Sequence, residues 1–273
     1  MKDYLKEIET IADEIDEIRS HIKDLNDEKL ELYRTYGTVL FSSVHLKHFE
    51  NCDNYEELLT AYDVFRSIRN KIQDLEAEIA DINRRDSIDF VIHLGDLTDF
   101  GSTLEYSLAR ERLQRLRKPF VVMQGNHDCL GTGNEVYAKM FGNNDFSFIA
   151  GRVKFIMINT NAIEYDYSEP VPDFDFLEAE ATRDSALFDR SVACMHAAPY
   201  SEQFNNNVLK PFNYYVMNFP NLMFCLYGHG HQIDEHDFFN NGIIYYEVAA
   251  AKKRKYRIFT ITPNGYANEV ISL

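Results

Sequence analysis

The sequence has no apolar stretch approaching the roughly 18–20 residues that a helix needs to cross a bilayer. Its N-terminus, residues 1–18, is charged throughout and lacks the apolar core of a signal peptide. We therefore predict a chain that neither spans a membrane nor carries an export signal. Hydrophobic residues make up 45% and charged residues 26% of the 273 residues, which excludes a disordered or low-complexity chain.

Cysteine is scarce, and its spacing forms neither a CxxC pair nor a paired framework. The four cysteines are Cys52, Cys129, Cys194 and Cys225. In a chain of this length they predict reduced thiols, which fits a cytoplasmic location.

Basic residues are outnumbered: 28 Lys and Arg stand against 44 Asp and Glu, for a net charge of −16. Such a surface repels nucleic-acid backbones and anionic lipids, so non-specific nucleic-acid binding is not expected. A small anion held in a positively charged pocket is still compatible with it. The one dense basic run, residues 252–257, favours a solvated strand edge or hairpin, with contact to phosphate or nucleic acid as the alternative.

Two stretches without Gly or Pro carry hydrophobic residues at alternating spacings of three and four. They cover residues 3–36 and 53–86, and the pattern is typical of long coiled-coil helices. We predict that 3–36 and about 62–86 form an antiparallel coiled-coil arm. The alternatives are two helices packed flat on a sheet, or parallel dimerisation through the first helix. Either form of coiled coil offers a surface for a protein partner or a homodimer.

From about residue 37 onward, apolar strands alternate with helices, which is typical of an α/β domain. The predicted strands cover 38–44, 89–94, 120–123, 154–158, 191–195, 222–227, 243–248 and 257–261, with helices such as 103–116 and 173–182 between them. We therefore assign residues 1–36 to an N-terminal coiled-coil helix and residues 37–273, including the extended helix 53–86, to the α/β domain.

Polar side chains follow four of these strands. They are Asp96 after the strand 89–94, Asn126 after 120–123, His196 after 191–195, and His229 with His231 after 222–227. In open α/β sheets, ligand sites form at the carboxyl ends of the strands, so we expect these side chains to meet. Carboxylate and amide oxygens mixed with imidazole suit Mn²⁺, Fe or Zn²⁺. The sequence therefore predicts a metal site.

The same residues carry a family resemblance. The segments Gly95-Asp96-Leu97-Thr98-Asp99, Gly125-Asn126-His127-Asp128, His196 and Gly228-His229-Gly230-His231 resemble, in order, the motifs of the calcineurin-like metallophosphoesterase superfamily. The resemblance covers about residues 37–273. It implies a four-layer α/β/β/α sandwich that binds two divalent metal ions.

The resemblance also implies roles for single residues. Asp96 would bridge both ions, Asn126, His196 and His229 would complete one site, and His231 with His45 would serve the other. His127 would be the catalytic acid or a transition-state stabiliser rather than a ligand, oriented by Asp128 or Asp99. A hydroxide between the two ions would attack the phosphorus, and His127 would protonate the leaving alkoxide.

The first motif departs from the family pattern. Ser43 stands in Ser43-Val44-His45 where the family has an aspartate, which removes a carboxylate from the metal site served by His45. Either this site is weakened and the enzyme works largely through the other ion, or the register of the strand 38–44 is wrong.

These observations together predict a phosphoesterase that hydrolyses a phosphomonoester or phosphodiester. The acidic surface favours a small nucleotide-like or metabolite substrate. The alternatives are a metal-dependent nuclease, and a weakly active or inactive scaffold that docks partners through its coiled coil. The presence of His127 argues against the scaffold, because a protein without catalytic activity does not need a proton donor beside a metal site.

Overall fold

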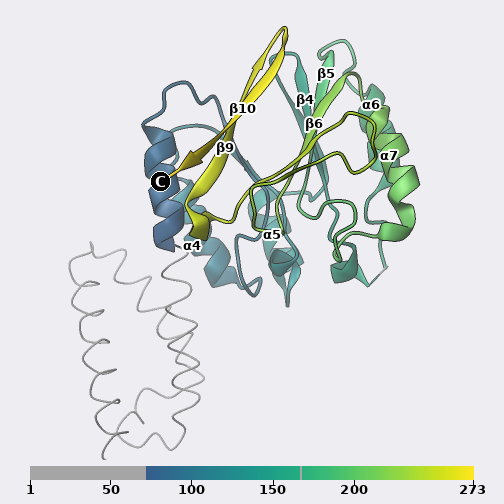
Figure 1. Ribbon diagram of the computed structural model, residues 1–273. Helices are drawn as coiled ribbons and strands as arrows, with labels where there is room; N and C mark the ends of the chain where they lie inside the picture. The colour runs from purple at the N-terminus through teal and green to yellow at the C-terminus, as the bar shows by residue number, and fades with distance from the viewer. Residues whose placement is uncertain (1–71, 167) are drawn as a thin grey trace, which may run out of the picture. The chain divides into compact units, whose positions relative to one another are not determined.

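The computed structural model describes residues 72–166 and 168–273 (Figure 1). The predicted helix 3–36, the predicted strand 38–44 with Ser43, and His45 lie outside the described residues, so the coiled-coil arm stays a prediction. Of the predicted helix 53–86, the structure describes residues 72 onward. These are helical as far as residue 83, so the helix ends three residues earlier than predicted. Among these residues, no helix is both long and apolar enough to pass through a membrane.

The larger sheet has six strands in the order β3-β4-β5-β6-β8-β7. Their bounds are β3 Phe146–Ala150, β4 Val153–Ile158, β5 Arg190–Met195, β6 Leu222–Tyr227, β7 Glu235–His236 and β8 Tyr245–Glu247. The four inner strands run parallel, and the two edge strands β3 and β7 are antiparallel to their neighbours. Nearly every residue of β4, β5 and β6 is buried, which explains their continuous apolar runs: both faces of this sheet are covered.

Two further strand pairs face this sheet. Strands β1 (Val91–His93) and β2 (Phe120–Val122) are parallel, while β9 (Lys255–Thr262) and β10 (Gly265–Ser272) form an antiparallel hairpin. The predicted basic run lies in the short helical turn η5 (Ala251–Lys253) and the first residues of β9.

Alternate residues along the inner strands belong to two different hydrophobic cores, one on each face of the sheet. Phe155 and Met157 of β4 belong to the core shared with β1, β2 and the β9–β10 hairpin. Ile156 and Ile158 belong instead to the core under α6 (Phe174–Thr182) and α7 (Leu209–Met217). This is the side-chain alternation of a strand with both faces buried.

A third core lies beneath helix 72–83, α4 (Thr103–Leu113) and α5 (Gly133–Phe141), which pack on β2 and β9. Helices, strand pairs, six-stranded sheet and helices therefore follow one another as layers (Figure 1). The predicted α/β fold is confirmed. Strands β3, β7 and β10 and helices α5 and α7 were not among the predicted elements.

Candidate metal centre

Asp96 is placed by a sharp turn at the carboxyl end of β1. Gly95 has φ 102° and Asp96 has φ 57°, so both take backbone conformations that L side chains rarely adopt. A Cβ on Gly95 would lie 2.5 Å from His196 Nδ1 and 2.7 Å from Gly125 Cα. Only glycine lets the end of β1 approach both the loop after β2 and the loop after β5 this closely.

Asp128 joins the loops that carry Asp96 and Asn126. Its fully buried carboxylate accepts hydrogen bonds from the backbone N–H groups of Gly125 (2.9 Å), Leu97 (3.1 Å) and Thr98 (2.8 Å), and from the Thr98 hydroxyl (2.8 Å). Burial raises the pKa of Asp128 to about 6, against the opposing effect of its hydrogen bonds with Gly125 and Thr98. These contacts fix the two loops against each other; none of them reaches His127.

His127 is exposed beside Asp96. Its backbone N–H donates to Asp96 Oδ1 (3.1 Å), and its ring Nδ1 lies 3.1 Å from the backbone carbonyl oxygen of Asp99. A carbonyl can only accept, so this contact places a proton on Nδ1. The group of Asp99 that orients the His127 ring is therefore its main-chain carbonyl.

His196 connects the two sheets. It follows β5, and its Nδ1 lies 2.6 Å from the carbonyl oxygen of Leu94, which follows β1. The contact places the proton on Nδ1 and leaves the Nε2 lone pair for a metal ion, the arrangement usual for ligating histidines. Nε2 lies 3.1 Å from Asn126 Oδ1 and 3.4 Å from Asp96 Oδ1.

His229 and His231 follow β6 in left-handed backbone conformations, with φ 63° and 61°. A Cβ on Gly230 between them would collide with the Glu247 carboxylate. His229 Nδ1 lies 3.0 Å from Asn126 Oδ1, and His231 Nε2 lies 4.0 Å from Asp96 Oδ2. Strained backbone is tolerated where the surroundings hold it, and such residues cluster at functional sites.

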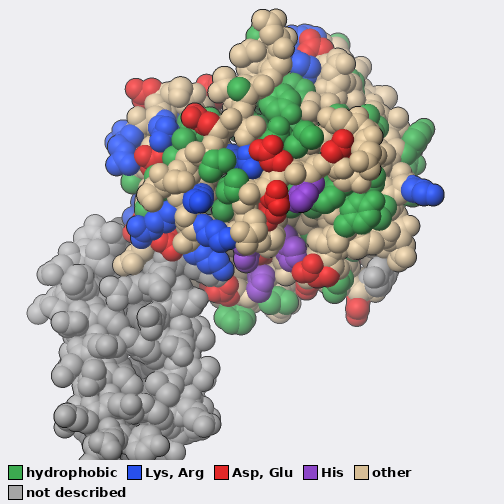
Figure 2. Space-filling view, viewed as in Figure 1, with side chains coloured by type: hydrophobic (Ala, Val, Ile, Leu, Met, Phe, Trp, Pro, Cys, Tyr) green, Lys and Arg blue, Asp and Glu red, His purple; other side chains and the backbone are tan. Residues whose placement is uncertain are grey.

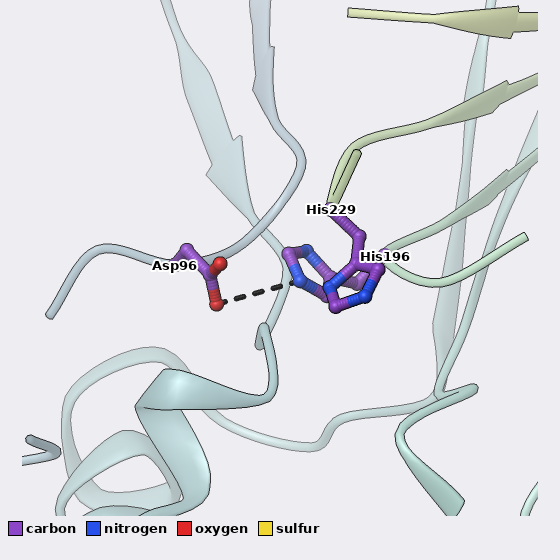
Figure 3. A group of neighbouring side chains, drawn as sticks. All are labelled: Asp96, His196 and His229. Carbon is purple, nitrogen blue, oxygen red and sulfur yellow. Dashed lines mark ion pairs between the residues drawn. The ribbon is translucent and has the colours of Figure 1, made fainter. Parts of the chain in front are cut away.

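Ligand atoms of Asp96, His196 and His229 all lie within 4.8 Å of one another (Figure 3). Figure 3 shows the three side chains converging from three separate loops, with the ion pair between Asp96 and His196 dashed. Burial opposes ionisation of Asp96, but hydrogen bonds with His196 and His231 outweigh it and hold the pKa of Asp96 far below its usual range. An ionised carboxylate, an amide oxygen and imidazole nitrogens fit a divalent ion such as Mn²⁺, Fe²⁺ or Zn²⁺.

The structure thus brings together Asp96, Asn126, His196, His229 and His231 from the predicted set, with His127 beside them and Asp128 beneath them. The predicted ligand His45 lies outside the described residues. One contact was missed by the sequence analysis: Glu202 Oε1 lies 2.9 Å from His229 Nε2. Glu202 belongs to none of the sequence motifs. The loop after β5 carries it to His229, and the sequence does not indicate the course of that loop.

Fold and site define an α/β protein with a candidate metal centre at the carboxyl ends of strands from two sheets. The sequence matches the profile of the calcineurin-like phosphoesterase family over residues 41–233, more than half of its length. The chain belongs to this family, and is in general terms a metal-dependent phosphoesterase, a hydrolase of phosphoesters.

Solved structures resemble the chain at low sequence identity. A dimetal phosphatase from Danio rerio, LOC 393393, shares the fold: it is 12% identical with a TM-score of 0.55, and the alignment covers 74% of this chain and 88% of that one. The protein TT1561 of Thermus thermophilus is 10% identical with a TM-score of 0.48, over 73% and 93% of the two chains. No curated protein matches the chain.

Proposed function

We propose that this protein hydrolyses a small phosphomonoester or phosphodiester with two divalent metal ions, for which a nucleotide-like or metabolite ester is the favoured substrate class. The observation that carries the proposal is the convergence of Asp96, His196 and His229 within 4.8 Å, with Asn126 Oδ1 close to both histidines. The acidic net charge of −16 disfavours a long polyanion such as nucleic acid.

The two oxygens of Asp96 face different histidines, which supports a bridging role. Oδ1 lies on the side of His196 and Oδ2 on the side of His231. We assign Asn126, His196 and His229 to one ion, and His231 with His45 to the other. When bound, the ions activate water and neutralise charge on the phosphoryl oxygens.

His127 is the proposed proton donor to the leaving oxygen. The Asp99 carbonyl holds its Nδ1 side, so Nε2 is the nitrogen free to deliver a proton to a leaving oxygen. The ring is exposed at the edge of the site, where a leaving group has room to depart. Asp128 is a positioning residue: it fixes the loops of Asp96 and Asn126.

The test is hydrolysis of p-nitrophenyl phosphate and bis-p-nitrophenyl phosphate by chelator-stripped protein, with Mn²⁺ added back. We expect metal-dependent turnover that falls at least ~100-fold in His127→Ala, the usual contribution of a general acid. The ratio of the two rates separates monoesterase from diesterase activity. No turnover of either ester with Mn²⁺, Fe²⁺ or Zn²⁺ would refute the proposal and favour a scaffold.

Ser43 provides a second arm of the same assay. It stands where the family has an aspartate, so we propose that the site served by His45 binds its ion more weakly than the site of His196. Ser43→Asp restores a carboxylate and should raise the affinity for the second Mn²⁺ equivalent in a calorimetric titration. An unchanged titration would mean that Ser43 does not face this site.

The predicted coiled-coil arm, residues 3–36 with about 62–86, is proposed as a docking device for a protein partner or a second copy. Its support is the heptad pattern of the sequence alone. Removing residues 1–36 should change the solution size while leaving Mn²⁺ affinity intact. Loss of Mn²⁺ binding on this deletion would show that the arm and the metal centre are not separate.

A further inference from the structure

A cluster of positive charge lies beside the metal centre in this acidic protein. Lys252, Lys253, Arg254 and Lys255 are consecutive and exposed, and we call them the basic turn. Arg254 pairs with Asp74 at 2.9 Å, whereas the three lysines form no ion pair with any of the described residues. Figure 2 shows Lys and Arg side chains gathered next to the histidines on the same face.

The backbone of the basic turn is fixed. Arg254 has φ 50°, its N–H donates to Ala251 O (2.7 Å), and its carbonyl accepts from Leu273 N (2.9 Å). The next residue but one, Tyr256, is buried and donates its hydroxyl to Asp81 Oδ2 (2.6 Å). The lysines therefore project from a rigid support, so little backbone entropy is lost when they bind a ligand.

A side-chain contact ties the basic turn to the metal centre. Lys253 Nζ donates to Gln232 Oε1 at 2.6 Å, and Gln232 directly follows His231. The position of Gln232 is itself held, because its backbone N–H donates to the Glu247 carboxylate at 2.8 Å. An ammonium group has three donors, so Lys253 keeps two for a ligand after its contact with Gln232.

We propose that the basic turn binds a second anionic group of the substrate, a phosphate or carboxylate, while the phosphoester to be cleaved lies at the metal centre. The proposal rests on the proposed function and narrows its substrate class to esters that carry a further anion, such as bisphosphates or nucleoside diphosphates. Because Arg254 is paired with Asp74, the basic turn offers a ligand the charges of its three lysines, too few for a long polyanion, which the acidic remainder of the surface would repel. It matches one or two phosphate groups.

Glucose 6-phosphate and glucose 1,6-bisphosphate differ by one phosphate. A basic turn that binds a second anionic group should favour the bisphosphate, whereas one that does not should leave the two sugars equally bound. Each is titrated as a competitor of p-nitrophenyl phosphate hydrolysis by the Mn²⁺-loaded full-length protein, and its direct binding is measured by calorimetry. Exposed charge pairs are individually weak, so we expect the bisphosphate to bind about three- to tenfold more tightly. This preference should shrink as salt is raised.

The informative variant is Lys252→Gln with Lys255→Gln, which spares the Lys253 contact with Gln232. Its matched control is Lys139→Gln with Lys210→Gln, two exposed lysines on α5 and α7, which changes the net charge equally. The preference for the bisphosphate should disappear in the first variant and persist in the control.

Equal binding of the two sugar phosphates by the wild-type protein would overturn the proposal. So would an equal preference for the bisphosphate in the Lys252→Gln/Lys255→Gln variant and in the control variant. These results are distinct from failure of the proposed function. That failure would appear as absent p-nitrophenyl phosphate hydrolysis, whereas calorimetry reports on the basic turn even without turnover.

Discussion

Replacing Gly95 by alanine should disrupt the candidate metal centre without replacing any of the proposed ligands. Two effects add at this position. An L side chain at φ 102° costs about 1–3 kcal/mol. The new Cβ would also lie 2.5 Å from His196 Nδ1 and 2.7 Å from the Gly125 backbone, and overpacking of this kind costs about 1–3 kcal/mol more. We therefore expect Gly95→Ala to lower the free energy of unfolding by about 2–6 kcal/mol.

Gly142→Ala is the control, because Gly142 has nearly the same φ, 99°, but no atom within 4 Å of a new Cβ. It should show the backbone penalty alone. Urea unfolding measures both variants, and Mn²⁺ titration should show an affinity about 10–100-fold lower for Gly95→Ala only, as for other changes behind metal ligands. Equal destabilisation of the two variants, or wild-type Mn²⁺ affinity in Gly95→Ala, would refute the reasoning.

Two further predictions concern stability. Burial raises the pKa of Asp145 to about 7, above its unfolded value, so ionisation of this carboxyl should destabilise the native state progressively from about pH 4 to above pH 7. Asp145→Asn should therefore gain stability relative to wild type as the pH rises from about 5 to 8 in urea unfolding; a constant difference would contradict this. Tyr256→Phe removes a hydrogen bond to the Asp81 carboxylate and should cost about 1–3 kcal/mol with unchanged Mn²⁺ affinity. A large loss of affinity would show that this contact also supports the metal centre.

The sequence predicted strands β4, β5 and β6, and the candidate ligand positions that follow β5 and β6, for the same physical reason. Strands β4, β5 and β6 are buried on both faces, so each is a continuous apolar run that ends abruptly in polar residues. The hairpin strand β10 was missed because all of its residues are exposed or half-buried and its composition, Gly-Tyr-Ala-Asn-Glu-Val-Ile-Ser, has no such contrast.

Contacts between distant loops could not be predicted from the sequence. The family resemblance implied that Asp128 or Asp99 orients His127, yet the Asp128 carboxylate binds backbone groups of residues 97 and 98. The contact between Glu202 and His229 joins residues that are 27 positions apart in the sequence, and no motif indicates it. Spacing along the chain indicates which side chains share a sheet edge, but not which donors and acceptors pair there.

The position of His196 has a mechanical consequence. Asp96 and Asn126 follow strands of one sheet, whereas His196 and His229 follow strands of the other, and the Leu94 carbonyl contact of His196 crosses between them. An ion held by all four would be a cross-link between two sheets that are otherwise joined by side-chain packing and by hydrogen bonds such as that from Asn161 Nδ2 to the Gln124 carbonyl. An ion that binds only the native state, present at about 100 times its Kd, adds about 2.7 kcal/mol to the free energy of unfolding. Loss of the ion would then weaken the attachment of the two sheets to each other, so the metal ion would contribute to the stability of the fold as well as to the reaction.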